Sequence, residues 1–254
     1  VVTKADSTDT GGIAVETGSS SNKKSGDIVI ATGEAVRAGN VILDAGFGVM
    51  HGGDVTINAG SSDSASGHVF VHSGGGSTAT GGQVVIQSGD SGYASGRVQV
   101  RSGSSIDAKS GSVTVESGPS YESSSGIVTV QAGAAGSGAG ANVYLSGGAI
   151  ATDDATSGAA IVSSGIAKGL NSASGETQVR SADTRAGNSG STTIATGSSA
   201  MGDTGSLIIE TGATVDGSTG SIGIASGLSA NRTSGDVWVH SGQGDNAGSV
   251  DVAS

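Results

Sequence analysis

The chain has 254 residues, of which 48 are glycine, one is proline, none is cysteine and only 2% are aromatic. This composition excludes a thick globular core, a disulfide framework and a thiolate metal site. The net charge of −11, with 11 lysines and arginines scattered singly, excludes the clustered positive charge that nucleic-acid binding requires. No apolar run approaches the roughly 18 residues of a membrane span, so we expect no such span.

The chain is built from tandem repeats, each consisting of a short run between two glycines and a spacer that leads to the next run. Residues 110–118, Ser-Gly-Ser-Val-Thr-Val-Glu-Ser-Gly, show the pattern: Val113 and Val115 alternate with polar residues, as in a half-buried β-strand. Seventeen repeats follow one another at spacings of 13 to 17 residues, most often 15. Their opening residues are Gly11, Gly26, Gly39, Gly53, Gly67, Gly82, Gly96, Gly111, Gly126, Ala141, Gly158, Gly175, Gly190, Gly205, Gly220, Gly235 and Gly248.

Arrays with a period this short are typical of solenoids. We therefore expect an all-β fold: a β-solenoid (β-helix) of about 17 coils, with one repeat of about 15 residues and two short strands per coil, as one continuous array over residues 1–254. The first strand would turn the side chains two and four residues after the opening glycine inward; we call these positions the first and second slots. The second strand would carry the small side chains two residues past each closing glycine, such as Ser20, Ala35, Gly48 and Ser120.

Charges on the outward positions favour one repeat per coil. Stacking successive repeats about 4.8 Å apart pairs Asp54 with His68 and Arg101 with Glu116, which are favourable neighbours. Stacking alternate repeats would instead place Asp27 on Asp54, where like charges repel. Seventeen coils at that spacing predict a rod roughly 80 Å long.

The middle position of each run, between the two slots, is apolar or aromatic in eight of the seventeen repeats. Two explanations stay open: β-branched and aromatic residues favour any strand position, or these side chains form a seam that another chain or a covering layer packs against. We call this set the middle-slot seam. Its members are Val29, Ile42, Phe70, Val85, Tyr144, Ile161, Ile208 and Trp238.

The two ends of the chain fall inside the repeat pattern. The sequence starts within a run at Val1 and stops at Ser254, just before a closing glycine. Solenoids need polar caps, because a bare terminal coil exposes unpaired N–H and C=O groups. This pattern predicts a segment of a longer array, or subunits that associate end to end.

Motifs that carry chemistry are scarce. The glycines of 136–140 follow no long strand and precede no helix, so they do not predict a phosphate site. His68 and His72 lack a third ligand in register, and the carboxylates are isolated apart from Asp153 and Asp154, so we expect no metal, no cofactor and no catalytic site. Asn231-Arg232-Thr233 is a glycosylation sequon on a spacer, which makes Asn231 a candidate acceptor of an N-linked glycan.

The repeat Ser-Gly-x-Val-x-Val-x-Ser-Gly, with spacers of Ser, Thr, Gly and Asp, resembles the long secreted Gly/Ser-rich arrays of diatoms and other stramenopile algae. The resemblance implies an extracellular or cell-surface structural material without catalytic residues. We expect a non-enzymatic structural protein of a fibre, sheath or surface appendage that self-associates end to end and laterally and carries or contacts glycans. The alternatives are an ice-binding or other surface-binding solenoid, which four middle-slot threonines (Thr56, Thr114, Thr129 and Thr193) only partly support, and a polysaccharide-acting β-helix, for which carboxylate clusters are missing.

Overall fold

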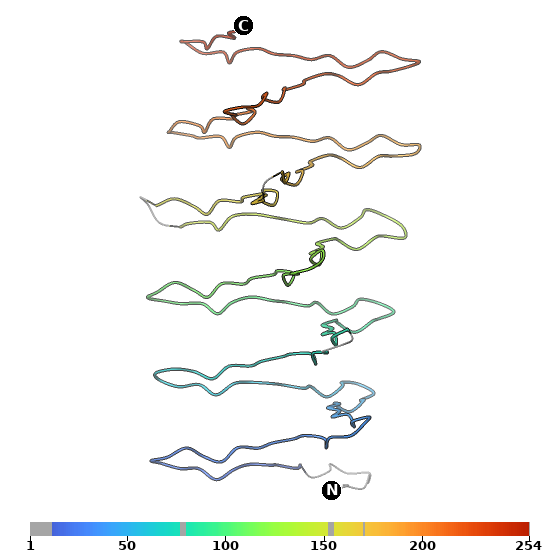
Figure 1. Cartoon of the computed structure of the whole chain (residues 1–254), viewed down its shortest axis with the longest axis vertical. Helices are drawn as coiled ribbons and strands as arrows, with labels where there is room; N and C mark the ends of the chain where they lie inside the picture. The colour runs from blue at the N-terminus through green and yellow to red at the C-terminus, as the bar shows by residue number, and fades with distance from the viewer. Residues whose placement is uncertain (1–11, 77–79, 152–154, 170, 254) are drawn as a thin grey trace. The chain divides into compact units, whose positions relative to one another are not determined.

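The computed structural model describes residues 12–76, 80–151, 155–169 and 171–253 of the chain. These residues belong to two compact units, Val1–Val128 and Thr129–Ser254, and we describe each unit by itself. Figure 1 shows long extended stretches and tight bends but neither an arrow nor a coiled ribbon, and the described residues contain no helix and no strand. The predicted β-solenoid is therefore wrong, and so are its coils of two short strands.

The runs fail to become strands because they do not pair with one another. Backbone-to-backbone hydrogen bonds number six in the described part of the chain, whereas folded proteins form about one internal hydrogen bond per residue. A strand is defined by the ladder of such bonds to a neighbour. The runs are thus extended segments, with the alternation of a strand but without its partners.

The predicted core is also absent, since none of the described side chains is buried. Val113 is 53% exposed and Val115 is 75% exposed, although both were expected to face inward. The accessible surface of the chain is 25570 Å², whereas a folded monomer of this size exposes about 10,000 Å². One trace of the expected pattern survives: in most runs the first slot is less exposed than the second.

The two slots supply too little apolar surface to build a core. Each repeat has two aliphatic slots, whereas the loss of conformational entropy on ordering the backbone applies to all of its roughly 15 residues. The many glycines raise this entropic cost further. The apolar content of the runs is too low to offset the ordering of their glycine-rich spacers.

The spacers, by contrast, are closed at their base in a recurrent way. An opening glycine lies against the small residue that precedes the previous closing glycine: a Cβ built on Gly53 would lie 3.2 Å from the Cβ of Ala45, and one on Gly67 would lie 3.4 Å from that of Ala59. In several spacers the opening residue also donates its N–H to the carbonyl of the closing glycine. These bonds are Gly53 to Gly46 (3.0 Å), Gly67 to Gly60 (2.9 Å), Gly82 to Gly74 (2.8 Å), Gly158 to Gly148 (2.9 Å) and Gly175 to Gly165 (3.4 Å).

The position two residues past the closing glycine is part of a turn and not of a second strand. The Oγ of Ser120 accepts a hydrogen bond from the N–H of Ser123 at 3.2 Å. Serine and threonine hydroxyls stabilise turns by bonding backbone groups two or three residues away. The same hydroxyl-to-backbone bond is made by Ser20, Ser62, Ser91, Ser105, Thr184, Ser199, Thr214 and Ser229.

Glycine at this turn position has a separate cause in the spacer 46–53. A Cβ on Gly48 would overlap the carbonyl oxygen of His51, so the bend leaves no room for a side chain. Two other spacer residues adopt left-handed backbone angles, Gly138 with φ of 85° and Asn171 with φ of 62°. Glycine and asparagine are the residues that tolerate this region best. Local backbone geometry, and not a facing strand, selects the residue types of the spacers.

Candidate functional site

The middle-slot seam is the largest set of candidate residues, and all eight of its members lie exposed on their runs. Phe70 is 75% exposed and Trp238 is 80% exposed. Val29, Ile42, Phe70 and Val85 belong to the first unit, and Tyr144, Ile161, Ile208 and Trp238 belong to the second. In each unit, therefore, apolar side chains of the seam are exposed to solvent and are not covered by other residues of that unit.

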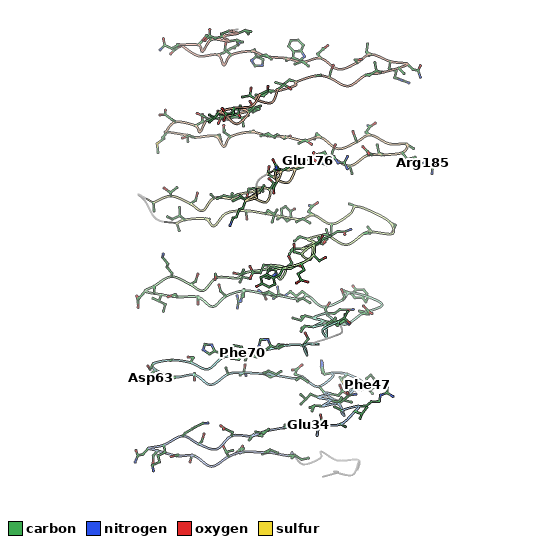
Figure 2. The ribbon with its side chains drawn as sticks, viewed as in Figure 1. Glu34, Phe47, Asp63, Phe70, Glu176 and Arg185 are labelled. Atoms are coloured by element: carbon green, nitrogen blue, oxygen red, sulfur yellow. The ribbon has the colours of Figure 1, made fainter. Side chains whose placement is uncertain are left out.

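Phe70 is the seam residue with the most organised surroundings. Its ring centroid lies 5.8 Å from that of His68 and 5.9 Å from that of His72, with interplanar angles of 48° and 20°. Residues two apart on an extended segment point to the same side, and Figure 2 shows Phe70 on such a stretch. The three rings form what we call the aromatic row. The sequence signal for it is the alternation His-x-Phe-x-His, which a search for metal ligands overlooks.

Tyr144 is the second seam aromatic with a defined partner. The Nδ2 group of Asn142 donates a hydrogen bond of 2.9 Å to the phenolic oxygen of Tyr144. The two residues are again two apart on one run, so they share a side of it. The ring remains exposed, and the bond fixes its polar tip.

Asn231, the candidate glycosylation site, lies exposed in a tight bend of the second unit. The Oγ of Ser229 accepts a hydrogen bond of 3.1 Å from the N–H of Arg232, which holds the backbone around Asn231 in a turn. An exposed turn leaves space for a bulky glycan. Glycosylation at Asn231 stays a prediction.

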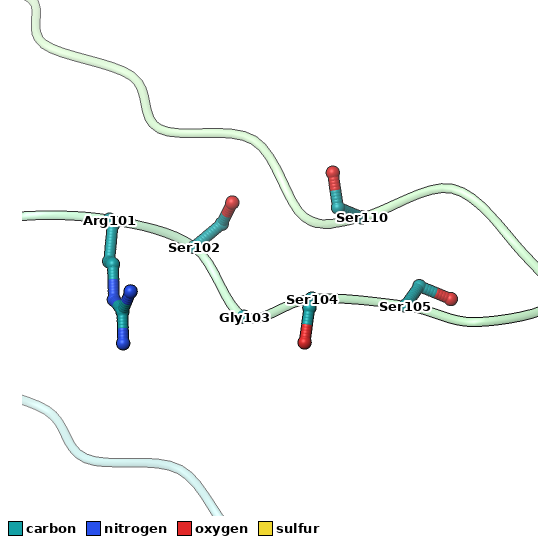
Figure 3. A pocket seen from close by; sticks show the side chains of 6 residues that line it. All are labelled: Arg101, Ser102, Gly103, Ser104, Ser105 and Ser110. Carbon is teal, nitrogen blue, oxygen red and sulfur yellow. The ribbon is translucent and has the colours of Figure 1, made fainter. Parts of the chain in front are cut away.

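An open hollow of about 560 Å³ is lined by Arg101, Ser102, Gly103, Ser104, Ser105 and Ser110. Its polar groups do not converge on one point. In Figure 3 the side chains of Arg101 and Ser102 point to opposite sides of the ribbon, and the hydroxyl of Ser110 points away from both. The Oγ of Ser105 is already bonded to the N–H of Ala108. We therefore assign no ligand to this hollow.

Charged side chains form no site within the described residues, which contain no group of three His, Cys, Asp or Glu that could hold a metal ion. The ion pair that these residues do form joins Lys24 and Asp27 at 3.0 Å. Both side chains are largely exposed, so the pair contributes about 0–1 kcal/mol. Among the described residues, no hydrogen bond or ion pair joins the predicted neighbours Asp54 and His68, and none joins Arg101 and Glu116.

Some sequence predictions concern parts of the chain that lie outside the described residues. They are the paired carboxylates Asp153 and Asp154 and the chain ends at Val1 and Ser254. The prediction of one continuous array over residues 1–254 also stays a prediction.

Comparison of the chain with protein-family models, with curated proteins and with solved structures finds no match. No helix long and apolar enough to cross a bilayer occurs in the portion of the chain described above.

Proposed function

We propose that this chain is a structural protein, without a catalytic role, that self-associates into an extracellular fibre, sheath or surface appendage. The observation that carries the proposal is the exposure of the aliphatic slots along the described runs. Apolar side chains at regular intervals, with the backbone groups between them unpaired, are surfaces that a partner can cover. Contact with further copies of the chain supplies that cover.

Repetition makes such contacts effective even though each is weak. One fully covered aliphatic side chain stabilises a contact by about 1.5–3 kcal/mol. When several repeats of one chain meet several repeats of another, each later contact forms at a high effective concentration. The middle-slot seam favours lateral association, and the repeat favours association along the chain direction.

The extracellular location rests on the resemblance to secreted Gly/Ser-rich arrays and on the exposed sequon at Asn231. A glycan at this turn would keep that part of the surface hydrated and direct association to the runs. Intact-mass measurement on chain secreted from a eukaryotic host tests the assignment, with Asn231→Gln as the control. Equal masses for both chains would remove glycosylation from the proposal.

The proposal is tested by sedimentation velocity and electron microscopy of the purified full chain over a range of concentration and salt. We expect assemblies that grow with protein concentration. Added salt should promote them, because the net charge of −11 makes the copies repel one another at low ionic strength. A chain that stays monomeric at millimolar concentration in physiological salt would contradict the structural role.

The surface-binding alternative has less support. Ice or a crystalline surface is bound by a regular flat array, and the four middle-slot threonines stand on separate runs that form no sheet within the described residues. No described feature favours this function over assembly. Thermal hysteresis in a solution of the chain would reverse the preference.

A further inference from the structure

The run 68–72 reads the same in both directions, His-Val-Phe-Val-His, and has an aromatic residue at its centre. The run 97–101, Arg-Val-Gln-Val-Arg, is also palindromic, but its centre is not aromatic and its arginines would repel those of an antiparallel copy. All five residues of the run 68–72 are exposed. The aromatic row occupies one side of the run, and Val69 and Val71 occupy the other, where they are 52% and 67% exposed. Each side of this run is therefore symmetric about Phe70 in its residue types.

A two-fold interface requires a surface that is complementary to itself, because the same patch is used by both subunits. A palindromic extended run meets this requirement. If a second copy lies antiparallel across it, each side chain faces a residue that is directly opposite on the same side, with Cβ atoms about 4.5–5.5 Å apart. Phe70 then meets the partner's Phe70, and His68 meets the partner's His72.

We propose that residues 68–72 are a self-association site at which a second copy of this chain lies antiparallel, with the two-fold axis at Phe70. The inference rests on the proposed self-association and names the contact that begins it. Its chemistry fits a second copy better than another partner. Short segments of β-branched and aromatic residues, with no proline and little charge, are those that stack on copies of themselves.

The aromatic row gives the contact its specificity. Aromatic pairs add about 0.5–1.5 kcal/mol beyond the area they bury, and Phe70 is already flanked by two rings that keep the row aligned. Five residues cover less than the roughly 800 Å² per partner of a standard stable interface. The contact is therefore reversible and depends on concentration, and it matures into larger assemblies only through the other repeats.

The first experiment compares Phe70→Ser with the matched control Phe47→Ser, because Phe47 is an exposed phenylalanine of a spacer and lies outside the middle-slot seam. Sedimentation velocity of the full chains is measured over a range of protein concentration. We expect Phe70→Ser to weaken dimerisation at least tenfold, while Phe47→Ser leaves it unchanged. Equal effects of the two variants would overturn the inference.

The second experiment uses the absence of native cysteine to test the direction of the pair. In the antiparallel arrangement Val69 faces the partner's Val71. Chains carrying Val69→Cys and Val71→Cys, one of them tagged, should therefore form disulfide-linked heterodimers several-fold faster than either forms homodimers. Faster homodimer formation by Val69→Cys alone would indicate a parallel pair and contradict the two-fold arrangement.

These results separate the site from the wider proposal. If the chain assembles but neither Phe70→Ser nor the cysteine pairs behave as expected, the site at 68–72 is wrong and the structural role stands. If the wild-type chain does not associate at any protein concentration, the structural role fails together with the site.

Discussion

The runs and the spacers of this chain differ in composition and in the number of hydrogen bonds that they form. Runs hold the aliphatic and aromatic side chains, yet these remain exposed and their backbones form no ladder. Spacers are rich in glycine and serine, yet they contain all six backbone-to-backbone hydrogen bonds of the described residues and the repeated hydroxyl bonds at the turns. Local order is thus concentrated where hydrophobicity is lowest.

The difference shows that two separate kinds of information are present in each repeat. The bends in the spacers depend only on residues close in sequence. They need a hydroxyl two residues past a closing glycine, or a glycine where no side chain fits. An alternating run specifies which side chains share a side but not what lies against them. The spacer can form within one copy, whereas the run needs a partner to complete it.

Among the substitutions considered, Gly48→Ala is expected to have the largest effect on the closure of a spacer. The added Cβ would overlap the carbonyl oxygen of His51, so the bend must open and the bond from Gly53 to Gly46 is lost. A hydrogen bond of this kind stabilises by about 0.5–1.5 kcal/mol. Amide hydrogen exchange at Gly53 should therefore accelerate about two- to tenfold.

Gly52→Ala in the same spacer is the control for that experiment. A Cβ there meets nothing closer than the carbonyl oxygen of Gly46 at 3.9 Å, so exchange at Gly53 should stay as in the wild type. Similar acceleration in both variants would mean that the spacer is not closed by the fit around Gly48.

Removing a turn hydroxyl is expected to have a smaller effect. Ser120→Ala deletes the acceptor of the Ser123 N–H. Because the turn is exposed, water replaces the bond and the loss is about 0.5 kcal/mol. Exchange at Ser123 should rise about twofold, whereas Ser124→Ala, a neighbouring hydroxyl, should leave it unchanged. The interpretation of Ser120 as a turn residue is wrong if the two variants behave alike.

Adding a turn hydroxyl should have the opposite effect and slow the exchange of a spacer amide. Ala135 occupies the turn position of the spacer 133–141, and residues 136–138 bend as residues 106–108 do after Ser105. Ala135→Ser should therefore supply an acceptor for the N–H of Gly138 and slow its exchange slightly, by a few tenths of a kcal/mol. Unchanged exchange at Gly138 would show that the turn position alone does not define the bond.

The smallest effect is expected in a run. Val113→Asp and Thr114→Asp should both leave the far-ultraviolet circular dichroism and the hydrodynamic radius of the monomer nearly unchanged, because surface substitutions usually change stability by less than about 0.5 kcal/mol. Val113 is 53% exposed, so its substitution buries no charge. If Val113→Asp alone lowered the free energy of unfolding by several kcal/mol, the side chain of the first slot would point inward after all.

The sequence predicted where the chain bends better than it predicted the fold. The bends of the described residues lie in the spacers that the flanking glycines delimit, whereas the runs predicted as strands, such as the one around Val113, are not strands. Pairing could not be predicted, because alternation names the side of a segment and not its neighbour. The small size of Ser120 fits a second strand and a turn equally well, and the hydrogen bond that its hydroxyl accepts distinguishes the turn. The alternation around Phe70 places the rings of His68, Phe70 and His72 on one side of the run, but it does not predict how closely the rings lie.

Closure of the spacers between nearby residues has a mechanical consequence. The bond from Gly53 to Gly46 joins positions seven residues apart, so opening it under tension releases at most about 23 Å of chain. Each spacer can yield without disturbing the next, and a loop of this length closes again in about 10–100 ns once the load is removed. A material made of such chains would lengthen in many small steps, dissipate work in each, and recover its original length.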